Sequence, residues 1–207
     1  MDQPVSATAG RTHSMQWRRL AWFGLAVAIV LCGFAAAFVL HSRGPDPRLV
    51  FPRIHGAGGV LPVDAGAAMP SPTAVHKLYV DVENDDADHG DVNARLNTAA
   101  KILNLYALAG VPSSNVRMVI LFYGTGVGLA LSDEAYRERF HHDNPNAELL
   151  TQLRRAGVKM EVCGQALGHQ QLTPANLHAG AQLALSALTA REELQAAGYG
   201  AVPTEAH

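Results

Sequence analysis

Apolar residues recur along the chain with two different periods. Short, nearly continuous apolar runs at 75–82, 116–123 and 158–162 predict strands, and the second run is typical of a strand buried on both faces. Between the first two runs the spacing changes to steps of four and three residues. The members of this helical stripe are Val92, Leu96, Ala99, Leu103 and Tyr106.

More helices are predicted further along the chain. A short helix is expected over 133–140, and Asn144 followed by Pro145 has the chemistry of a cap and first helical residue for a helix that stops at Gly157. Thr173 and Pro174 form the same pair of cap residue and first helical proline, which predicts a helix towards Gln195. Residues 199–202 are predicted to form a short last strand. Alternating strands and helices predict an α/β fold with a parallel or mostly parallel sheet and helices on both faces.

The longest apolar run covers 20–40 and contains no charged residue. As a helix it would span roughly 30 Å, the thickness of a bilayer's hydrocarbon core. Trp17 and Trp22 lie near its start, where aromatic rings favour the headgroup region. We therefore expect one transmembrane helix that serves as a signal anchor. The alternative is a signal peptide cleaved near Ala35–Ala37, although the run is longer than the usual apolar region of about 7–15 residues.

Basic residues favour one orientation of this helix. Arg11, Arg18 and Arg19 precede it, whereas Arg43 and Arg48 follow it with an aspartate between them. The positive-inside rule then predicts a cytoplasmic N-terminal tail over 1–19. We expect a single-pass protein of the inner, cytoplasmic membrane with a periplasmic C-terminal domain, or a periplasmic protein if the signal is cleaved.

The segment 41–74 holds six prolines and five glycines, a composition typical of a flexible linker. One folded domain is then expected over 75–203, a sufficient length for its own core. From residue 75 onward ten Lys and Arg stand against fifteen Asp and Glu, a formal charge of −5. This acidic balance disfavours nucleic-acid binding, which requires a basic surface to neutralise phosphates.

Cys163 is the strongest chemical candidate. It ends the strand at 158–162, and the carboxyl ends of strands in open α/β sheets border the crevice where such folds bind ligands. The only other cysteine, Cys32, lies in the apolar run, so a disulfide framework within the domain is excluded. The missing second thiol also argues against a self-contained dithiol reductase. A free cysteine is also a small hydrophobe, and from position alone core packing is as good an interpretation as a chemical role.

The domain resembles the DsrE/DsrF-like family of small sulfur-handling proteins over roughly 76–203. The resemblance rests on four stretches, and the cysteine element paired with the Leu-Gln…Gly-Tyr ending is the most specific part. The stretches are HKLYVDV, VILFYGTGV, NAELLTQLRRAGVKMEVCGQAL and LQAAGYGAV.

This resemblance implies a three-layer α/β/α fold that associates into trimers or hexamers. It also implies that Cys163 carries sulfane sulfur as a persulfide and exchanges it with a donor or acceptor protein, as a sulfur carrier or sulfurtransferase. An anchored and exported chain departs from the cytoplasmic relays of the family, so their partners do not transfer to it. A non-catalytic, oligomeric binding or scaffold module of the cell envelope is the alternative.

Residues near the thiol are further candidates for binding a sulfur species. Gly164 can let the backbone turn sharply beside the sulfur, and Gln165 can either orient a bound species or cap the turn. His169 can supply a proton or a cation, although a surface histidine is the commoner interpretation. Backbone N–H groups at Gly124 and Gly126 can line the crevice, or these glycines simply form a tight turn.

No cofactor or metal is expected from the sequence. The glycines at 124, 126 and 128 do not form the dinucleotide-binding pattern, and no P-loop lysine follows them. His141, His142 and Asp143 are adjacent, but they lack the spacing of a zinc site.

Overall fold

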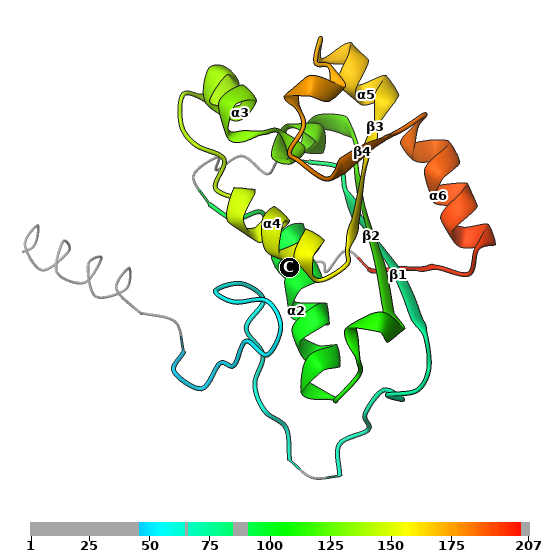
Figure 1. Cartoon of the computed structure of the whole chain (residues 1–207). Helices are drawn as coiled ribbons and strands as arrows, with labels where there is room; N and C mark the ends of the chain where they lie inside the picture. The colour runs from blue at the N-terminus through cyan, green and yellow to red at the C-terminus, as the bar shows by residue number, and fades with distance from the viewer. Residues whose placement is uncertain (1–45, 65, 85–90, 204–207) are drawn as a thin grey trace, which may run out of the picture. The chain divides into compact units, whose positions relative to one another are not determined.

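The computed structural model describes residues 46–64, 66–84 and 91–203, and those from Arg48 onward belong to one compact unit. Five strands form one sheet in the order β4-β3-β2-β1-β5, and every neighbouring pair is parallel (Figure 1). The strands are β1 (His76–Val82), β2 (Val116–Phe122), β3 (Lys159–Cys163), β4 (Ala181–Ala184) and β5 (Gly200–Ala201). The predicted parallel α/β fold is confirmed.

Helices follow the strands and cover both faces of the sheet. The helices are α2 (Ala94–Leu108), α3 (Asp133–Phe140), α4 (Ala147–Arg155), α5 (Gly164–His169) and α6 (Ala187–Ala196). Three 3₁₀ turns join them: η1 (Ser113–Asn115), η2 (Gly124–Ala130) and η3 (Pro174–Asn176). The predicted stripe is confirmed at its centre, where Leu96, Ala99 and Leu103 of α2 are nearly inaccessible to solvent. Val92 precedes the helix and is 42% exposed, and Tyr106 is only half-buried.

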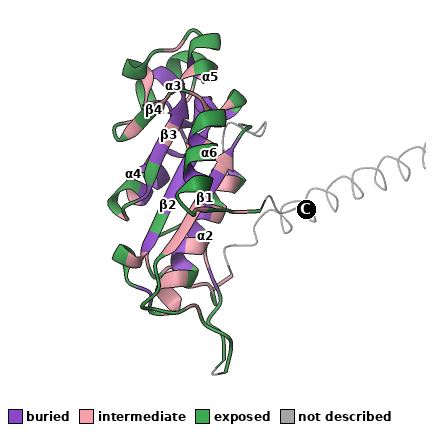
Figure 2. Ribbon diagram, turned by 90° about the vertical axis from the view of Figure 1, so that its right-hand side faces the viewer, coloured by how far each residue is buried: buried purple, intermediate pink, exposed green. Residues whose placement is uncertain are grey.

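The main core lies between the sheet and the helices α2 and α4. It joins inward side chains of β1, β2 and β3 to one stripe of each helix in a continuous apolar cluster. The opposite face is covered by α6, which Figure 2 shows in front of the largely buried central strands. Two smaller clusters form there, one around Cys163 and one around Tyr79.

The helix predicted from Thr173 towards Gln195 is wrong in its first half. Thr173 and Pro174 open only the single turn η3, and residues 181–184 instead pair with β3 as the edge strand β4. Ser186 then caps α6, accepting a hydrogen bond of 3.2 Å from the Thr189 N–H. Sheet pairing overrides the local preference of an alanine- and leucine-rich segment, because its backbone groups gain partners on β3.

The helix predicted to open at Pro145 begins slightly later, at Ala147. The Asn144 side chain is buried and donates to the carbonyls of Leu129 and Leu131, at 3.0 and 2.9 Å. Its oxygen accepts from the Asn146 N–H at 2.9 Å. Asn144 therefore holds the preceding loop against the helix start instead of capping the helix directly.

Part of the expected linker is folded. Val50 and Val60 form an antiparallel bridge with hydrogen bonds of 2.9 and 3.1 Å, and Ile54 between them is 1% exposed. Asn104 of α2 holds this loop: its side-chain oxygen accepts from the N–H groups of Arg53 and Ile54, and its amide donates to three loop carbonyls. Residues 50–60 therefore belong to the folded unit and not to a free tether.

The expected N-terminal tail at 1–19 and transmembrane helix at 20–40 lie outside the described residues. Across 46–64, 66–84 and 91–203, no helix combines the length and the apolar character needed to cross a bilayer.

Candidate functional site

Cys163 is the last residue of β3 and the residue that caps α5. Its sulfur accepts a hydrogen bond from the Ala166 backbone N–H at 3.5 Å, which satisfies one of the free N–H groups at the start of the helix. This sulfur lies at the carboxyl end of the strand, as the sequence predicts. The strand-to-helix turn therefore fixes the thiol at the edge of the sheet.

Small side chains surround this thiol. Cys163 is 6% exposed and packs on the α6 side of the sheet in a cluster with Leu121 of β2 and with Ala187 and Ala190 of α6. Tyr123, Ala166 and Ala184 are half-buried and pack against the same cluster. Four alanines therefore form most of this shell, together with the larger side chains of Leu121 and Tyr123.

An ion pair lies beside the cysteine cluster. Arg191 of α6 donates to both carboxylate oxygens of Asp81 on β1, at 3.0 and 3.3 Å. The Arg191 guanidinium also lies over the Tyr123 ring, 5.0 Å from its centre. These three side chains link α6 to the carboxyl ends of β1 and β2, next to the residues that cover Cys163.

The charges of this group shift its proton equilibria. Hydrogen bonding to Asp81 raises the pKa of Arg191, so the guanidinium stays charged. Burial raises the pKa of Tyr123, and the negative charges of Asp81 and Glu83 raise it further, whereas Arg191 opposes the shift. The phenol therefore stays protonated near neutral pH and offers a hydrogen-bond donor beside the cluster.

The two glycines expected to line the crevice have structural roles in the turn η2. Gly126 is buried, and its N–H donates to the Glu83 carbonyl at 2.8 Å, so this N–H is not free for a ligand. A side chain at Gly126 would collide with the Val82 carbonyl, its Cβ lying 2.3 Å away. Gly124 has a φ of +55°, and its carbonyl accepts from the Gln170 side chain at 2.7 Å.

The other expected binding residues lie along α5. Gly164 allows the close approach of the helix start to β4, because a Cβ there would lie 2.9 Å from the Ala184 carbonyl. Gln165 is exposed and donates to the Leu185 carbonyl at 3.4 Å, which ties α5 to the loop before α6. His169 is exposed at the far end of α5, where no described residue connects its ring to Cys163.

Sequence reasoning missed Asp81, Tyr123, Arg191 and Gln170. The sequence held a modest signal for two of them, because Asp81 and Tyr123 lie at the ends of the strands predicted at 75–82 and 116–123. Arg191 lies 110 residues from Asp81, so only the folded chain reveals this pair. Within the described ranges, no group of three or more His, Cys, Asp or Glu side chains could hold a metal ion.

This geometry supplies a thiol, one backbone donor to its sulfur and a compact apolar shelter. No described acidic or basic side chain hydrogen-bonds to the sulfur, whose donor is the Ala166 backbone N–H. Such a site fits a group carried on sulfur better than a hydrolytic nucleophile, which needs an adjacent base.

Two solved structures are similar to part of this chain. One is a protein of unknown function, MTH1491 from Methanobacterium thermoautotrophicum, at 16% identity with a TM-score of 0.46, covering 61% of this chain and 97% of that one. The other is the ychN protein from E. coli, at 15% identity with a TM-score of 0.39, covering 62% of this chain and 99% of that one. No curated protein sequence matches the chain.

The family is shown by the sequence itself. The profile of the DsrE/DsrF-like family matches residues 81–203, which is more than half of the chain and spans Cys163, its helix α5 and the covering helix α6. The chain therefore belongs to the DsrE/DsrF-like family.

Proposed function

We propose that this protein relays sulfane sulfur as a persulfide on Cys163. The observation that supports this most directly is the place of the sulfur: it lies at the strand-to-helix turn, with a backbone N–H directed at it and alanines around it. Membership of the DsrE/DsrF-like family suggests a role of the sulfur-relay type.

The transfer is a thiol exchange without net oxidation. The Cys163 thiolate attacks the outer sulfur of a donor persulfide, R–S–SH, forming a new S–S bond while the donor S–S bond breaks. The donor leaves as the thiolate R–S⁻, and the protein holds Cys–S–SH. An acceptor thiolate reverses these steps and releases the Cys163 thiolate.

Burial of the thiol requires an opening step in the proposed relay. Cys163 is 6% exposed, and α6 covers it through Ala187 and Ala190. Leu185 and Leu188, which flank the start of α6, are 73% and 77% exposed. We propose that another copy of the chain or a sulfur-exchange partner docks on these leucines, consistent with a trimer or hexamer.

The proposal includes the place of the domain in the cell. The uncharged run at 20–40 would anchor the chain in the inner membrane, with the folded domain in the periplasm. A periplasmic relay would require partners different from the cytoplasmic relays of the family. Alkaline phosphatase fused after Pro203 would be active if the domain is exported, and inactivity of this fusion would contradict the orientation.

Intact-mass analysis of the full chain tests the sulfur relay. The protein is incubated with glutathione persulfide, beside a Cys163→Ala variant that keeps the small side chain of the cluster. We expect a gain of one or more sulfur atoms that reduction removes and that the variant lacks. A gain in the wild type no greater than that in Cys163→Ala contradicts carriage at this thiol, because sulfur taken up by Cys32 is common to both proteins.

A scaffold role is the second candidate, and the burial of Cys163 favours it. In this role the cysteine only packs, and the exposed leucines hold an assembly together. Resistance of Cys163 to alkylation in the folded assembly, together with no sulfur gain, would support the scaffold. Rapid alkylation with sulfur gain would support the relay.

A further inference from the structure

Helix α2 has a second apolar face that the core covers only in part. Leu96, Ala99 and Leu103 point into the main core. Ile102, Leu105, Tyr106 and Ala109 continue on a neighbouring face and line a groove of about 510 Å³. A helix that is apolar on two faces is expected to be covered on both.

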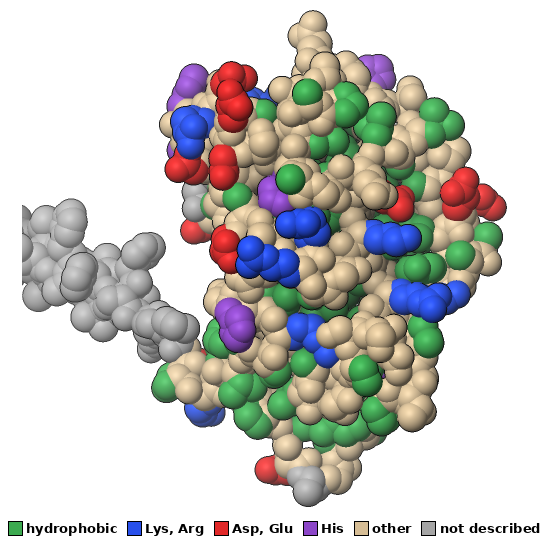
Figure 3. Space-filling model, viewed as in Figure 1, with side chains coloured by type: hydrophobic (Ala, Val, Ile, Leu, Met, Phe, Trp, Pro, Cys, Tyr) green, Lys and Arg blue, Asp and Glu red, His purple; other side chains and the backbone are tan. Residues whose placement is uncertain are grey.

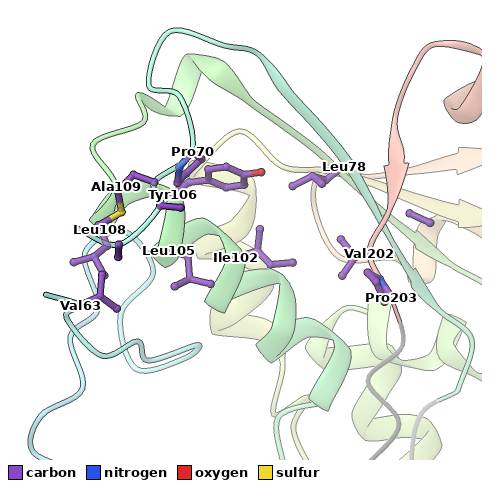
Figure 4. A pocket seen from close by; sticks show the side chains of 14 residues that line it. Val63, Pro70, Leu78, Ile102, Leu105, Tyr106, Leu108, Ala109, Val202 and Pro203 are labelled. Atoms are coloured by element: carbon purple, nitrogen blue, oxygen red, sulfur yellow. The ribbon is translucent and has the colours of Figure 1, made fainter. Parts of the chain in front are cut away.

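Three separate segments form the walls of this groove. Figure 4 shows the lining side chains along α2, with Val63 and Pro70 on one side and Val202 and Pro203 on the other. Leu78 of β1 closes the floor between them. In Figure 3, hydrophobic side chains gather at the end of the molecule where α2 ends. The lining is almost wholly aliphatic, as is typical of pockets for apolar ligands.

The wall formed by residues 202 and 203 is held in place by hydrogen bonds. Arg95 donates to the carbonyls of Val202 and Pro203 at 3.1 and 2.9 Å, and the Val202 N–H donates to the Tyr79 carbonyl at 2.8 Å. These bonds exist without a ligand, so this side of the groove is preformed.

The opposite wall is also anchored. Asn115 donates to the Pro72 carbonyl at 2.9 Å, and a hydrogen bond of 2.9 Å joins the His76 ring to the Ser71 carbonyl. The His76 ring also packs on Tyr106, with 4.6 Å between ring centres. Both sides of the groove are therefore set by the folded chain.

Apolar side chains remain open to solvent at the mouth of the groove. Val63, Met69 and Leu105 are 54%, 50% and 46% exposed. Burying such area is favourable by about 25 cal/mol per Å², so an apolar molecule seated here would gain free energy.

Tyr106 supplies the polar group of the groove. Figure 4 shows its hydroxyl directed toward Leu78 across the cavity. This hydroxyl has no hydrogen-bond partner within the part of the chain that the structure describes. Burial raises the pKa of Tyr106, so near neutral pH the phenol can both donate and accept a hydrogen bond.

We propose that this groove binds the hydrocarbon chain of a single-chain amphiphile of the fatty-acid class, with its polar group at Tyr106. The lining residues carry no charged side chain, and Tyr106 supplies their one hydroxyl, which matches a ligand with an apolar chain and a single polar group. The site is independent of Cys163, which lies on the α6 side of the sheet.

Photo-crosslinking tests the proposal in the full chain. The protein, in lipid nanodiscs, is irradiated with a palmitate analogue carrying a diazirine on its chain, and labelled peptides are mapped by mass. We expect labels within 63–70, 102–109 or 201–203. Labels confined to 20–40, or links between two chains through these segments, would overturn the proposal, the latter because a second copy would then cover the groove.

Matched variants sharpen the test. Leu105→Lys places a charge at the mouth and should lower groove labelling about fivefold or more, and Val63→Lys on the opposite wall should do the same. Val92→Lys changes a comparably exposed apolar residue outside the groove and should leave labelling unchanged. Equal labelling of all three variants would overturn the site. Tyr106→Phe should lower labelling about twofold, and no change would overturn the placement of the polar group.

Discussion

The two faces of the sheet differ in how they are covered. On one face α2 and α4 enclose a continuous core that runs from β1 to β3, and the loop at 50–60 adds Ile54 to it. On the other face α6 alone covers two separate clusters, one at Cys163 and one at Tyr79. The first face buries mainly leucine, valine and isoleucine, whereas alanines surround the thiol.

This difference separates stability from chemistry. Large aliphatic side chains provide most of the free energy of burial, so the α2 and α4 face should dominate the free energy of unfolding. Helix α6 is held by small side chains at Cys163, by Leu194 at the Tyr79 cluster, by the pair with Asp81 and by a hydrogen bond of 2.9 Å from Gln195 to the Tyr79 hydroxyl. Because it buries fewer large side chains than the first face, we expect this cover of the thiol to open at a lower cost in free energy.

The largest effect is expected where the loop at 50–60 joins the first face. Asn104→Ala removes two accepted and three donated hydrogen bonds of a fully buried side chain. We expect the free energy of unfolding to fall by about 2 kcal/mol or more, measured by urea denaturation. Trypsin should also begin to cleave after Arg53, because Ile54 would leave the core.

Asn97 offers a graded control for this prediction. Its side chain makes one bond to the loop, accepting from the Gly58 N–H at 2.7 Å. Asn97→Ala should cost about 1 kcal/mol and leave Arg53 protected. Equal losses in the two variants would mean that the loop adds little to this face.

A smaller effect on stability is expected on the second face. Asp81→Asn breaks the ion pair with Arg191. Both side chains of this pair are about a quarter exposed, so the free energy of unfolding should fall by about 1 kcal/mol or less. Because α6 loses one of its links to β1, alkylation of Cys163, followed by peptide mapping, should become faster. The pKa of Tyr123 should fall, because a negative charge that raises it is gone.

The exposed pair between Arg137 and Asp143 is the control for Asp81→Asn. Asp143→Asn removes an ion pair that lies far from α6 in the chain. It should change neither the rate of Cys163 alkylation nor the pKa of Tyr123 measured by ultraviolet titration. Comparison with Tyr123→Phe identifies the Tyr123 signal in that titration. If Cys163 is alkylated at the same rate in Asp81→Asn as in the wild type, the expectation that α6 opens at low cost is wrong.

Local patterns were sufficient for much of the first face. The apolar runs at 75–82 and 116–123 and the stripe through Leu103 each depend on neighbouring residues, so their period reveals both the element and its buried side. The position of Cys163 at a strand end follows from the same kind of signal. The parallel sheet was therefore predictable.

Contacts between distant segments were not predictable. Asn104 holds Ile54 across 50 residues, and Asp81 meets Arg191 across 110. The proline and glycine content of 41–74 indicates its local backbone preference. It does not reveal that side chains of α2 hold part of this segment in place. In the same way, β4 exists because β3 offers it an edge, which its own sequence does not reveal.

The smallest effect on the free energy of unfolding is expected from His178, at the edge of the first face. Its backbone N–H donates to the Ala130 carbonyl at 2.8 Å, and its ring shares a hydrogen bond of 3.2 Å with the Thr151 hydroxyl of α4. The other ring nitrogen, Nδ1, is buried without a partner among the described residues. Burial lowers the pKa of His178 from 6.5, and the charge of Arg154 lowers it further, against the opposing effect of Asp133.

The direction of the pH effect follows from this shift. The unfolded chain takes up a proton at His178 more readily than the folded chain. The contribution of the neutral ring to the free energy of unfolding is therefore present above pH 6.5. It is lost as the pH falls from 6.5 towards the lower pKa of the folded protein. Wild type should therefore lose more free energy of unfolding than His178→Gln between about pH 7.5 and about pH 5.5. Because the ring is only half-buried, this difference should be smaller than the effect of Asp81→Asn. If the free energy of unfolding changes equally with pH in the two proteins, protonation of His178 does not destabilise the first face.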